Sequence, residues 1–367
     1  MTLNPLARLL QQAERELRPL TALLELTYRC NLLCSFCYNA PRPGQELDTA
    51  RWLEVLDRLR AAGTFKVVLS GGEPLLHPGF WEIAEGVRER GFVLEVYTNA
   101  VPLARPEAAE RLAALSPFKV EISLHGPDAA THERLTGVAG SFEKVITALE
   151  NLSRLGVNVT VKTPITRLNQ DRLGEISRLV EELGYAVTFD PNIVPTDDGD
   201  TGPLSLAPDR EALVRFFLER ARAGGGLAPR PVEKFSAVCF AGRTTLAIDP
   251  WGDVFPCVAW RRKVCNILEV EDFGAVWRSR RSPSRALRYV RRATEAAMER
   301  LREDEPAAFA TYCPAVAEKE TGSPMRWYPA ARVTGEAKFE AWRRLNEDER
   351  EKLLADAGAE GESCEGT

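Results

Sequence analysis

Short apolar runs alternate with longer amphipathic stretches over the first half of the chain. Six of these runs are rich in Val, Leu, Ile or Phe and end in polar residues, as buried parallel strands do where they enter loops; they cover residues 23–27, 66–70, 93–98, 119–124, 158–163 and 186–190. The stretches between them, such as TARWLEVLDRLRAAG, have the periodicity of helices. The repeat predicts an α/β fold with right-handed crossovers and a parallel sheet. Six units fit a partly open barrel or a doubly wound sheet, and both place the chemistry at the carboxyl ends of the strands.

The repeat stops after the sixth predicted strand. A helical stretch leads to AGGGLAPRP, whose glycines and prolines are typical of a linker. TTLAIDPWGDVFPCVAW then has a hairpin pattern with its turn at Trp251-Gly252-Asp253, and GEAKFEAWRRLNEDEREKLLADAG predicts one terminal helix. We therefore expect an N-terminal helix over residues 1–20, a barrel-type domain over 21–225, a smaller α+β module over 226–330, and a C-terminal helix and tail over 331–367.

Composition and charge exclude several classes of protein. Hydrophobic residues make up 44% of the chain and charged residues 28%, which is ordinary for a globular protein. The net charge of -5 argues against a dedicated nucleic-acid binder. No apolar run is long enough to span a membrane, and the start of the chain lacks the apolar core of a signal peptide. We therefore expect a cytoplasmic protein whose 8 cysteines serve a metal or catalysis rather than disulfides.

Three of these cysteines, Cys30, Cys34 and Cys37, lie in CNLLCSFC directly after the first predicted strand. Three thiolates on one tight loop can ligate three irons of a [4Fe–4S] cluster and leave the fourth iron open to an exogenous ligand. A zinc site and incidental core cysteines are the alternatives. Zinc sites usually complete four protein ligands, and no His or Cys follows nearby to complete the set. The position at the catalytic end of the first strand favours the cluster.

The CxxxCxxC spacing, with the aromatic Phe36 before the third cysteine, resembles that of radical SAM enzymes. Gly71-Gly72-Glu73-Pro74 is similar to the GGEP loop of that family, which receives the methionine amino group of S-adenosylmethionine. Glycines allow a backbone to approach a ligand closely, and a carboxylate suits an ammonium partner. The resemblance implies a (βα)6 partial TIM-type barrel in which S-adenosylmethionine is cleaved reductively and a 5′-deoxyadenosyl radical abstracts hydrogen from a substrate.

Later segments resemble family motifs at successive strand ends. Thr98-Asn99-Ala100 resembles the TNG segment, and Ser123-Leu124-His125-Gly126 resembles an SLDG-type segment whose serine contacts the cofactor ribose. Ordinary capping of strand ends is the alternative for the polar residues of both segments. Relatives often carry an arginine just before the glycine of the ERLTG segment, where it binds the cofactor carboxylate. This chain has Thr136 there, so the resemblance leaves Arg134 or Lys162 to supply the charge.

A second set of cysteines lies beyond the predicted linker. Cys239 and Cys257, with Gly252 between them, resemble the opening of the SPASM/Twitch auxiliary-cluster modules of radical SAM enzymes. Only Cys313 lies where full modules carry a cysteine-rich run, so the resemblance implies at most one auxiliary [4Fe–4S] cluster. Cys265 stands where relatives often show Gly, and we expect it to be the fourth ligand beside Cys239, Cys257 and Cys313. Buried structural cysteines or a zinc site are the alternatives.

The resemblance implies a substrate that is a ribosomally synthesised peptide or protein, and an electron donor such as flavodoxin or ferredoxin. Few residues precede the first predicted strand, so we expect a peptide substrate to need a separate carrier protein. A small metabolite such as a haem or tetrapyrrole precursor is the alternative substrate. A non-catalytic, metal-stabilised scaffold is an alternative of another class, and the GGEP loop argues against it.

Two charged segments have more than one interpretation. A row of arginines with helical spacing is either a solvated face or a docking site for an acidic partner: Arg281, Arg285, Arg288 and Arg292. Four aspartates follow the sixth predicted strand on the expected active face: Asp190, Asp197, Asp198 and Asp200. They are either turn residues or candidates for acid–base chemistry.

Overall fold

The computed structural model describes residues 5–40, 42–229, 239–301, 309 and 311–363. Its centre is one sheet with the strand order β6-β5-β4-β3-β2-β1-β7-β8-β9. The strands from β6 to β1 are parallel and run along the chain in sequence order: β1 (Thr21–Glu25), β2 (Lys66–Ser70), β3 (Val93–Thr98), β4 (Lys119–Ser123), β5 (Val159–Pro164) and β6 (Ala186–Asp190). The six strands predicted from the sequence are confirmed, with ends that differ by two residues at most.

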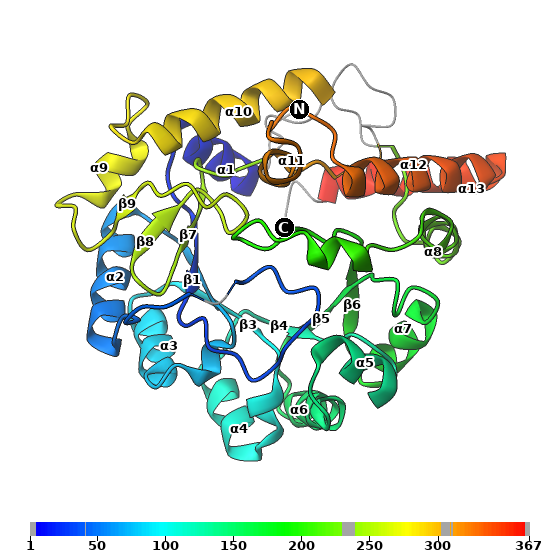
Figure 1. Cartoon of the computed structure of the whole chain (residues 1–367), viewed down its shortest axis with the longest axis horizontal. Helices are drawn as coiled ribbons and strands as arrows, with labels where there is room; N and C mark the ends of the chain where they lie inside the picture. Colours follow the sequence, from blue (N-terminus) through cyan, green and yellow to red (C-terminus); the bar gives the residue numbers. More distant parts are fainter. Residues whose placement is uncertain (1–4, 41, 230–238, 302–308, 310, 364–367) are drawn as a thin grey trace.

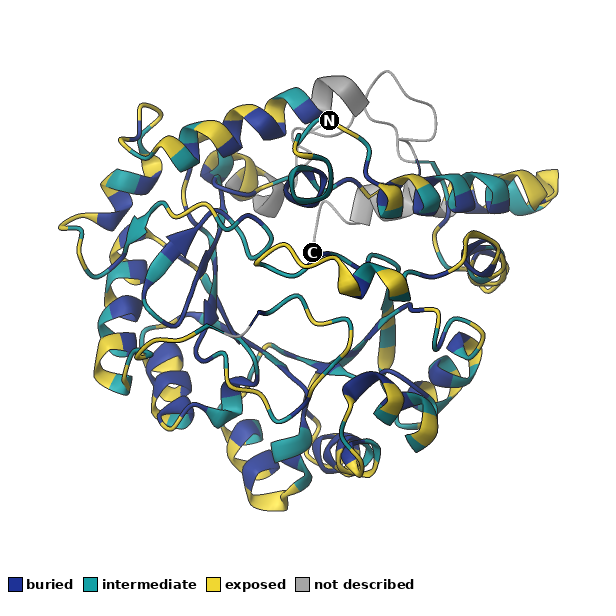
Figure 2. Cartoon of the chain, in the orientation of Figure 1, coloured by how far each residue is buried: buried dark blue, intermediate teal, exposed yellow. Residues whose placement is uncertain are grey.

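Helices follow the strands and cover the outer side of the curved sheet (Figure 1). They are α2 (Thr49–Ala62), α3 (Phe80–Glu89), α4 (Pro106–Ala114), α5 (Ala129–Thr136), α6 (Ser141–Arg154) and α7 (Leu173–Glu182), with short 3-10 turns η1 (Pro74–Leu76), η2 (Val101–Ala104) and η3 (Gly202–Leu206). Figure 2 shows that the buried residues of these helices face the sheet and the exposed residues face outward. Because the helices lie along one side of a curved sheet, the architecture is a partial barrel rather than a doubly wound sheet.

The C-terminal module continues the barrel sheet. β7 (Thr245–Ile248) pairs in parallel with β1, and β8 (Asp253–Phe255) and β9 (Cys265–Asn266) extend the sheet in antiparallel fashion. The predicted hairpin is confirmed, and the Asp249 carboxylate fixes its turn by accepting from the backbone N–H groups of Trp251 at 3.0 Å and Asp253 at 2.9 Å. Apolar residues of the module, including Trp277, belong to the same core as the barrel. The barrel and the module therefore share both a sheet and a core.

The remaining helices pack around the open side of the sheet (Figure 1). They are α1 (Pro5–Arg15), α8 (Arg210–Arg222), α9 (Phe273–Arg278), α10 (Arg285–Leu301), α11 (Pro314–Thr321), α12 (Pro329–Arg344) and α13 (Glu347–Ser363). α1 lies within the N-terminal segment where the sequence predicts a helix. Within the part of the chain that the structure describes, no helix has the length and apolar character of a membrane span.

The single terminal helix predicted from the sequence is wrong, because the structure has two helices there. The backbone becomes extended at Leu345, with φ -74° and ψ 146°. Asn346 and Glu349 then cap each other: the Glu349 N–H donates to Asn346 Oδ1, and the Asn346 N–H donates to Glu349 Oε2, both at 2.8 Å. This reciprocal capping box starts α13 as a new helix.

The arginine-rich stretch contains one buried anchor. Arg291 donates from its guanidinium to the carbonyl oxygens of Gly242 at 2.7 Å, Ser279 at 2.9 Å and Trp277 at 2.6 Å. It is 8% exposed, and burial lowers the pKa of its guanidinium to about 10, which still leaves it charged at neutral pH. Arg291 thus attaches α10 to the end of α9 and to the segment that enters β7.

We expect the Arg291→Met variant to lose about 3 kcal/mol of unfolding free energy, because three carbonyl oxygens lose a charged donor in a buried place. The exposed neighbour Arg292 provides the control, and Arg292→Met should change stability by about 0.5 kcal/mol or less. Thermal denaturation of both variants and the parent chain checks this. Equal melting temperatures for the two variants would contradict the anchoring role.

Candidate active site

The loop after β1 and the loop after β2 are locked together by backbone contacts. The Gly72 N–H donates to the carbonyl of Thr27 at 2.7 Å, and the Glu73 N–H donates to the carbonyl of Arg29 at 2.9 Å. Gly71 has φ +136°, and a Cβ at Gly71 or Gly72 would collide with backbone atoms of residues 27–29. Only glycine fits these two positions, so the pair of glycines holds the loop after β1 close to the end of β2.

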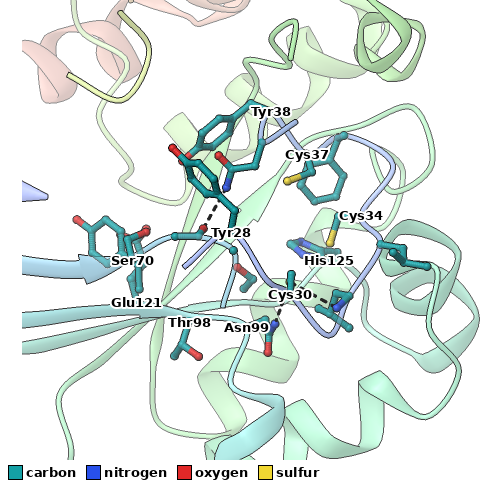
Figure 3. A pocket seen from close by; sticks show the side chains of 18 of the residues that line it. Tyr28, Cys30, Cys34, Cys37, Tyr38, Ser70, Thr98, Asn99, Glu121 and His125 are labelled. Atoms are coloured by element: carbon teal, nitrogen blue, oxygen red, sulfur yellow. Dashed lines mark hydrogen bonds between the residues drawn. The ribbon is translucent and has the colours of Figure 1, made fainter. Parts of the chain in front are cut away.

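Cys30, Cys34 and Cys37 line one cavity of about 560 Å³ together with Gly71 and Gly72. In Figure 3 the three cysteines follow the loop after β1 around one side of this cavity. Burial raises the pKa of all three thiols, and burial together with the neighbouring Cys30 and Cys37 thiolates raises that of Cys34 to about 12. Such thiols stay protonated at neutral pH until a metal displaces the protons. Their chemistry and their shared cavity fit a three-cysteine iron–sulfur cluster with an open iron.

A zinc ion is the competing occupant of a cysteine site. Among the described side chains, no group of three or more His, Cys, Asp or Glu has an arrangement that holds a single metal ion.

Glu73 lies behind the cavity wall rather than on it. Its carboxylate is fully buried and accepts from the Thr98 hydroxyl at 2.7 Å, from the Asn99 N–H at 2.7 Å and from the Leu75 N–H at 3.1 Å. Burial raises the pKa of Glu73 to about 7 in spite of these donors. Pro74 is also buried and begins η1. In this structure Glu73 orients Thr98 and Asn99, and its carboxylate faces neither cavity described here.

The ends of β3 and β4 contribute the next part of the wall. Thr98 and Asn99 line the cavity, and Asn99 Nδ2 donates to the Cys30 thiol at 3.7 Å and to Asn31 Oδ1 at 2.8 Å. Ala100, where the family motif has Gly, adopts the left-handed conformation with φ 61°. The Ala100 N–H donates to the Thr98 hydroxyl, so Thr98 both caps the strand end and faces the cavity.

Ser123 and His125 lie on the wall beside the cysteine loop. The His125 ring contacts Phe36 edge to face at 4.9 Å and stacks on His132 at 5.4 Å. Burial lowers the pKa of His125 to about 3 and that of His132 to about 4, so both rings are neutral at physiological pH. The aromatic residue before the third cysteine therefore braces His125 in a fixed orientation.

Of the two cations suggested as replacements for an arginine at Thr136, only Lys162 faces a cavity. Thr136 is fully buried and its hydroxyl is 2.9 Å from that of Ser141. Arg134 is exposed on α5 and lines neither cavity described here. Lys162 on β5 lines a second cavity, and its ammonium is 3.7 Å from a Glu121 carboxylate oxygen.

The second cavity, of about 500 Å³, connects the cysteine loop to the C-terminal module. It shares several wall residues with the first cavity: Phe36, Tyr38, Ser70, Tyr97, Glu121, Ser123 and His125. Its far wall includes Cys313, Lys319 and Tyr328. Tyr97 and Glu121, which also line the cavity, were not singled out from the sequence. A signal for them exists in the sequence: they are polar residues at alternate positions of apolar strands, and such positions point into the barrel.

The structure brings together three of the four cysteines of the second set. Cys239, Cys257 and Cys313 pack on one small apolar cluster, and each of these thiols has a pKa raised by burial. The thiolates of Cys239 and Cys313 raise the pKa of Cys257 further, to about 12. Cys265 packs on the main core instead, with Asp253, Lys263 and Glu269 as its charged neighbours. Its expected place as the fourth ligand is therefore not supported, because β9 carries it away from the other three.

The two charged segments also differ from expectation. Arg281 lies before α10 begins, and Arg288 donates to the carbonyl of Ser282, so the four arginines do not form one continuous helix face. Asp190 lines the second cavity, whereas Asp198 and Asp200 are exposed in a turn closed by Thr196. Asp197 belongs to the same turn, but its side chain is fully buried and lines neither of the two cavities.

Asp197 forms the centre of a buried ion group that spans the whole site. Its side chain is fully buried, and its carboxylate contacts Arg42 at 3.0 Å, Arg261 at 2.9 Å and Lys319 at 2.8 Å. Arg261 also donates both terminal nitrogens to the Glu25 carboxylate at 2.6 Å, and Glu25 is fully buried at the end of β1. The group links the end of β1, the loop after β6, the segment after β8, and α11.

Comparison with known proteins decides the family. The sequence model of the radical SAM superfamily matches residues 24–182, and that of the SPASM iron-sulfur cluster-binding domain matches residues 239–303. Mycofactocin maturase MftC of Mycobacterium tuberculosis is 32% identical over 295 residues, which cover 75% of this chain and 75% of that protein. The chain belongs to the radical SAM superfamily. The enzymes of this superfamily use S-adenosylmethionine and a [4Fe–4S] cluster, and a SPASM domain adds auxiliary iron–sulfur clusters.

This radical SAM enzyme is also similar to a second curated relative and to a solved structure. AdoMet-dependent heme synthase of Methanosarcina barkeri is 32% identical over 201 residues, which cover 53% of this chain and 56% of that protein. The structure of anSMEcpe with bound AdoMet and the Cp18Cys peptide superposes with a TM-score of 0.68 at 15% identity, over 92% of this chain and 99% of that chain. The latter shows that the two proteins share a fold. The matched ranges lie inside the predicted barrel (21–225) and module (226–330), whose boundaries stay predictions.

The buried Glu73 carboxylate predicts a pH dependence of stability in the metal-free protein. Its pKa rises from 4.5 to about 7 on folding, so the folded state favours the protonated acid. Relative to a Glu73→Gln variant, the parent chain should lose about 3 kcal/mol of stability as the pH rises through this window. Melting temperatures of both proteins between pH 5 and pH 8 check this, with the exposed Glu82→Gln as the control. Parallel pH curves for the parent and Glu73→Gln would contradict it.

Proposed function

We propose that this radical SAM enzyme modifies a ribosomally synthesised peptide and that Cys30, Cys34 and Cys37 hold its catalytic [4Fe–4S] cluster. The observation that carries the assignment is the convergence of these three thiols in one cavity with the glycine pair at the end of β2. When bound, the cluster supplies the electron that cleaves S-adenosylmethionine to methionine and a 5′-deoxyadenosyl radical, which abstracts hydrogen from the substrate. The chain's own residues bind the cofactor, orient the substrate and exclude water.

For S-adenosylmethionine we propose seven of the residues that line the first cavity: Phe36, Gly71, Gly72, Thr98, Asn99, Ser123 and His125. Glu73 and Pro74 support this wall from behind, because the Glu73 carboxylate holds Thr98 and the backbone of Asn99. Lys162 is the better candidate than Arg134 for an anionic group of a bound molecule, because Lys162 alone lines a cavity.

The second cavity is the proposed substrate chamber. It shares a wall with the cofactor cavity and extends to Cys313, so a substrate placed in it lies between the two cysteine sets. Most of its charged groups come in pairs, as Lys162 with Glu121 and Lys319 with Asp197. The match to the maturase MftC, over three quarters of both chains, supports a peptide as the substrate.

A tetrapyrrole precursor is the second candidate, and the similarity to the heme synthase supports it. That similarity covers about half of each chain, so a peptide is favoured. Incubation with each class of molecule, followed by mass spectrometry of the products, distinguishes the two.

The location and the remaining partners are also proposals. The seven described cysteines are free thiols, which suits the reducing conditions of the cytoplasm. A flavodoxin or ferredoxin as the electron donor and a separate carrier for the peptide complete the proposal.

Removal of the first cysteine set tests the catalytic cluster. After reconstitution and reduction, the parent protein should hold about eight irons per chain and release 5′-deoxyadenosine from S-adenosylmethionine. Replacing Cys30, Cys34 and Cys37 with Ala should abolish this release and leave about four irons, because the auxiliary set is intact. Iron analysis and chromatography of the nucleoside measure both quantities. Undiminished release of 5′-deoxyadenosine by the triple variant would refute the assignment.

Single cysteine substitutions test the auxiliary set. The Cys265→Ala variant should keep all of its iron, because Cys265 lies apart from the other three cysteines. The Cys257→Ala variant should lose about half of the iron and some stability, because metal ligation couples to folding. Iron content and visible absorption compare the two variants. Loss of about four irons from Cys265→Ala would restore Cys265 as a ligand.

A further inference from the structure

The buried ion group carries an excess of positive charge. Among the described residues, its cations are Arg42, Arg261 and Lys319, and its carboxylates are Glu25 and Asp197, so the group as a whole has one positive charge more than negative. Glu25 and Asp197 have fully buried side chains, and Arg261 and Lys319 are 9% and 18% exposed. Charges in such an environment act strongly on their surroundings, because little water screens them.

The group lies between the two cysteine sets. On one side, the Asp197 N–H donates to the carbonyl of Tyr38, the residue after Cys37, at 2.8 Å. On the other side, Lys319 belongs to α11, which begins directly after Cys313. Lys319 and Cys313 line the same cavity. Among the three cations of the group, Lys319 is thus the one that shares a cavity wall with a cysteine of the auxiliary set.

We propose that Lys319, held in place by Asp197, raises the reduction potential of the auxiliary cluster. The inference rests on the proposed function, in which Cys239, Cys257 and Cys313 hold that cluster. A positive charge stabilises the reduced form of a cluster, which carries one more negative charge, and net charge is one of the factors that set cluster potentials. Lys319 is a positioning residue in this proposal, since it acts through the cluster and takes no part in the bond changes.

The ion pair with Asp197 gives the proposal its geometry. Lys319 Nζ is 2.8 Å from Asp197 Oδ1, and the other Asp197 oxygen is occupied by Arg42 and Arg261. The ammonium therefore stays at one place on the cavity wall instead of turning to solvent. Asp197 also opposes the charge of Lys319, so removal of the carboxylate and removal of the ammonium change the local charge in opposite directions.

The test is a redox titration of the reconstituted full-length protein, followed by electron paramagnetic resonance of both clusters. Lys319→Gln should shift the auxiliary potential to a more negative value, and Lys319→Arg, which keeps the charge, should keep the parent value. Lys263→Gln is the matched control, because Lys263 lies in the same module and its side chain is 53% exposed. The control should leave both potentials unchanged.

The outcomes separate this proposal from the proposed function. A more negative auxiliary potential in Lys319→Gln, but not in Lys319→Arg or Lys263→Gln, supports it when iron content is retained. An unchanged auxiliary potential in Lys319→Gln, or the same shift in Lys319→Arg, overturns it and leaves the cluster assignment intact. A parent protein that holds the first cluster but no second one overturns both this proposal and the auxiliary assignment.

Discussion

The arrangement of the barrel and the C-terminal module depends on the burial of two carboxylates, Glu25 and Asp197. An ionised carboxylate away from water needs a charged partner, and removal of one partner of a buried pair typically costs about 3–5 kcal/mol. Arg261 and Lys319, two of the three partners, come from the C-terminal part of the chain. That part must therefore fold against the end of β1 and the loop after β6, which flank the open side of the barrel. Charge compensation thus fixes where the module lies over the catalytic end of the sheet.

The sheet and the ion group join the barrel and the module at different places. Pairing of β7 with β1 joins the module to the barrel through backbone hydrogen bonds, and the shared core adds apolar burial. The ion group then links the segments beyond the strand ends, where the chemistry lies. As a result, the cysteine loop and Cys313 of the second set line cavities that share part of their walls. This geometry supports the proposed substrate chamber between the two cysteine sets.

The parts that the sequence predicted correctly depend on short-range patterns. The six parallel strands, the hairpin around Gly252 and the clustering of Cys30, Cys34 and Cys37 all come from periodicity or spacing within a few residues. The break between α12 and α13 was missed even though its capping residues Asn346 and Glu349 are local in the sequence. No proline or glycine marks the break, because residues 346–352 are all polar.

The features of the site that the sequence did not predict have a long-range origin. Glu25 and Arg261 are 236 positions apart, and Asp197 and Lys319 are 122 positions apart, so no local pattern indicates their pairing. Cys265 was expected in the auxiliary set because a fourth thiol was needed, and its packing on the main core depends on strand β9. The fully buried position of Glu73 likewise depends on β3, because its partners Thr98 and Asn99 lie at the end of that strand. These long-range contacts form only after distant strands have paired in the sheet.

In the proposed function, the cluster of the cysteine loop has an open iron that S-adenosylmethionine ligates. Electron paramagnetic resonance of the reconstituted, reduced protein with and without S-adenosylmethionine reports on this ligation. We expect the cofactor to change the signal of the cluster that is lost when Cys30, Cys34 and Cys37 are replaced, and to leave the other signal unchanged. A cofactor-induced change confined to the signal that survives these replacements would contradict it.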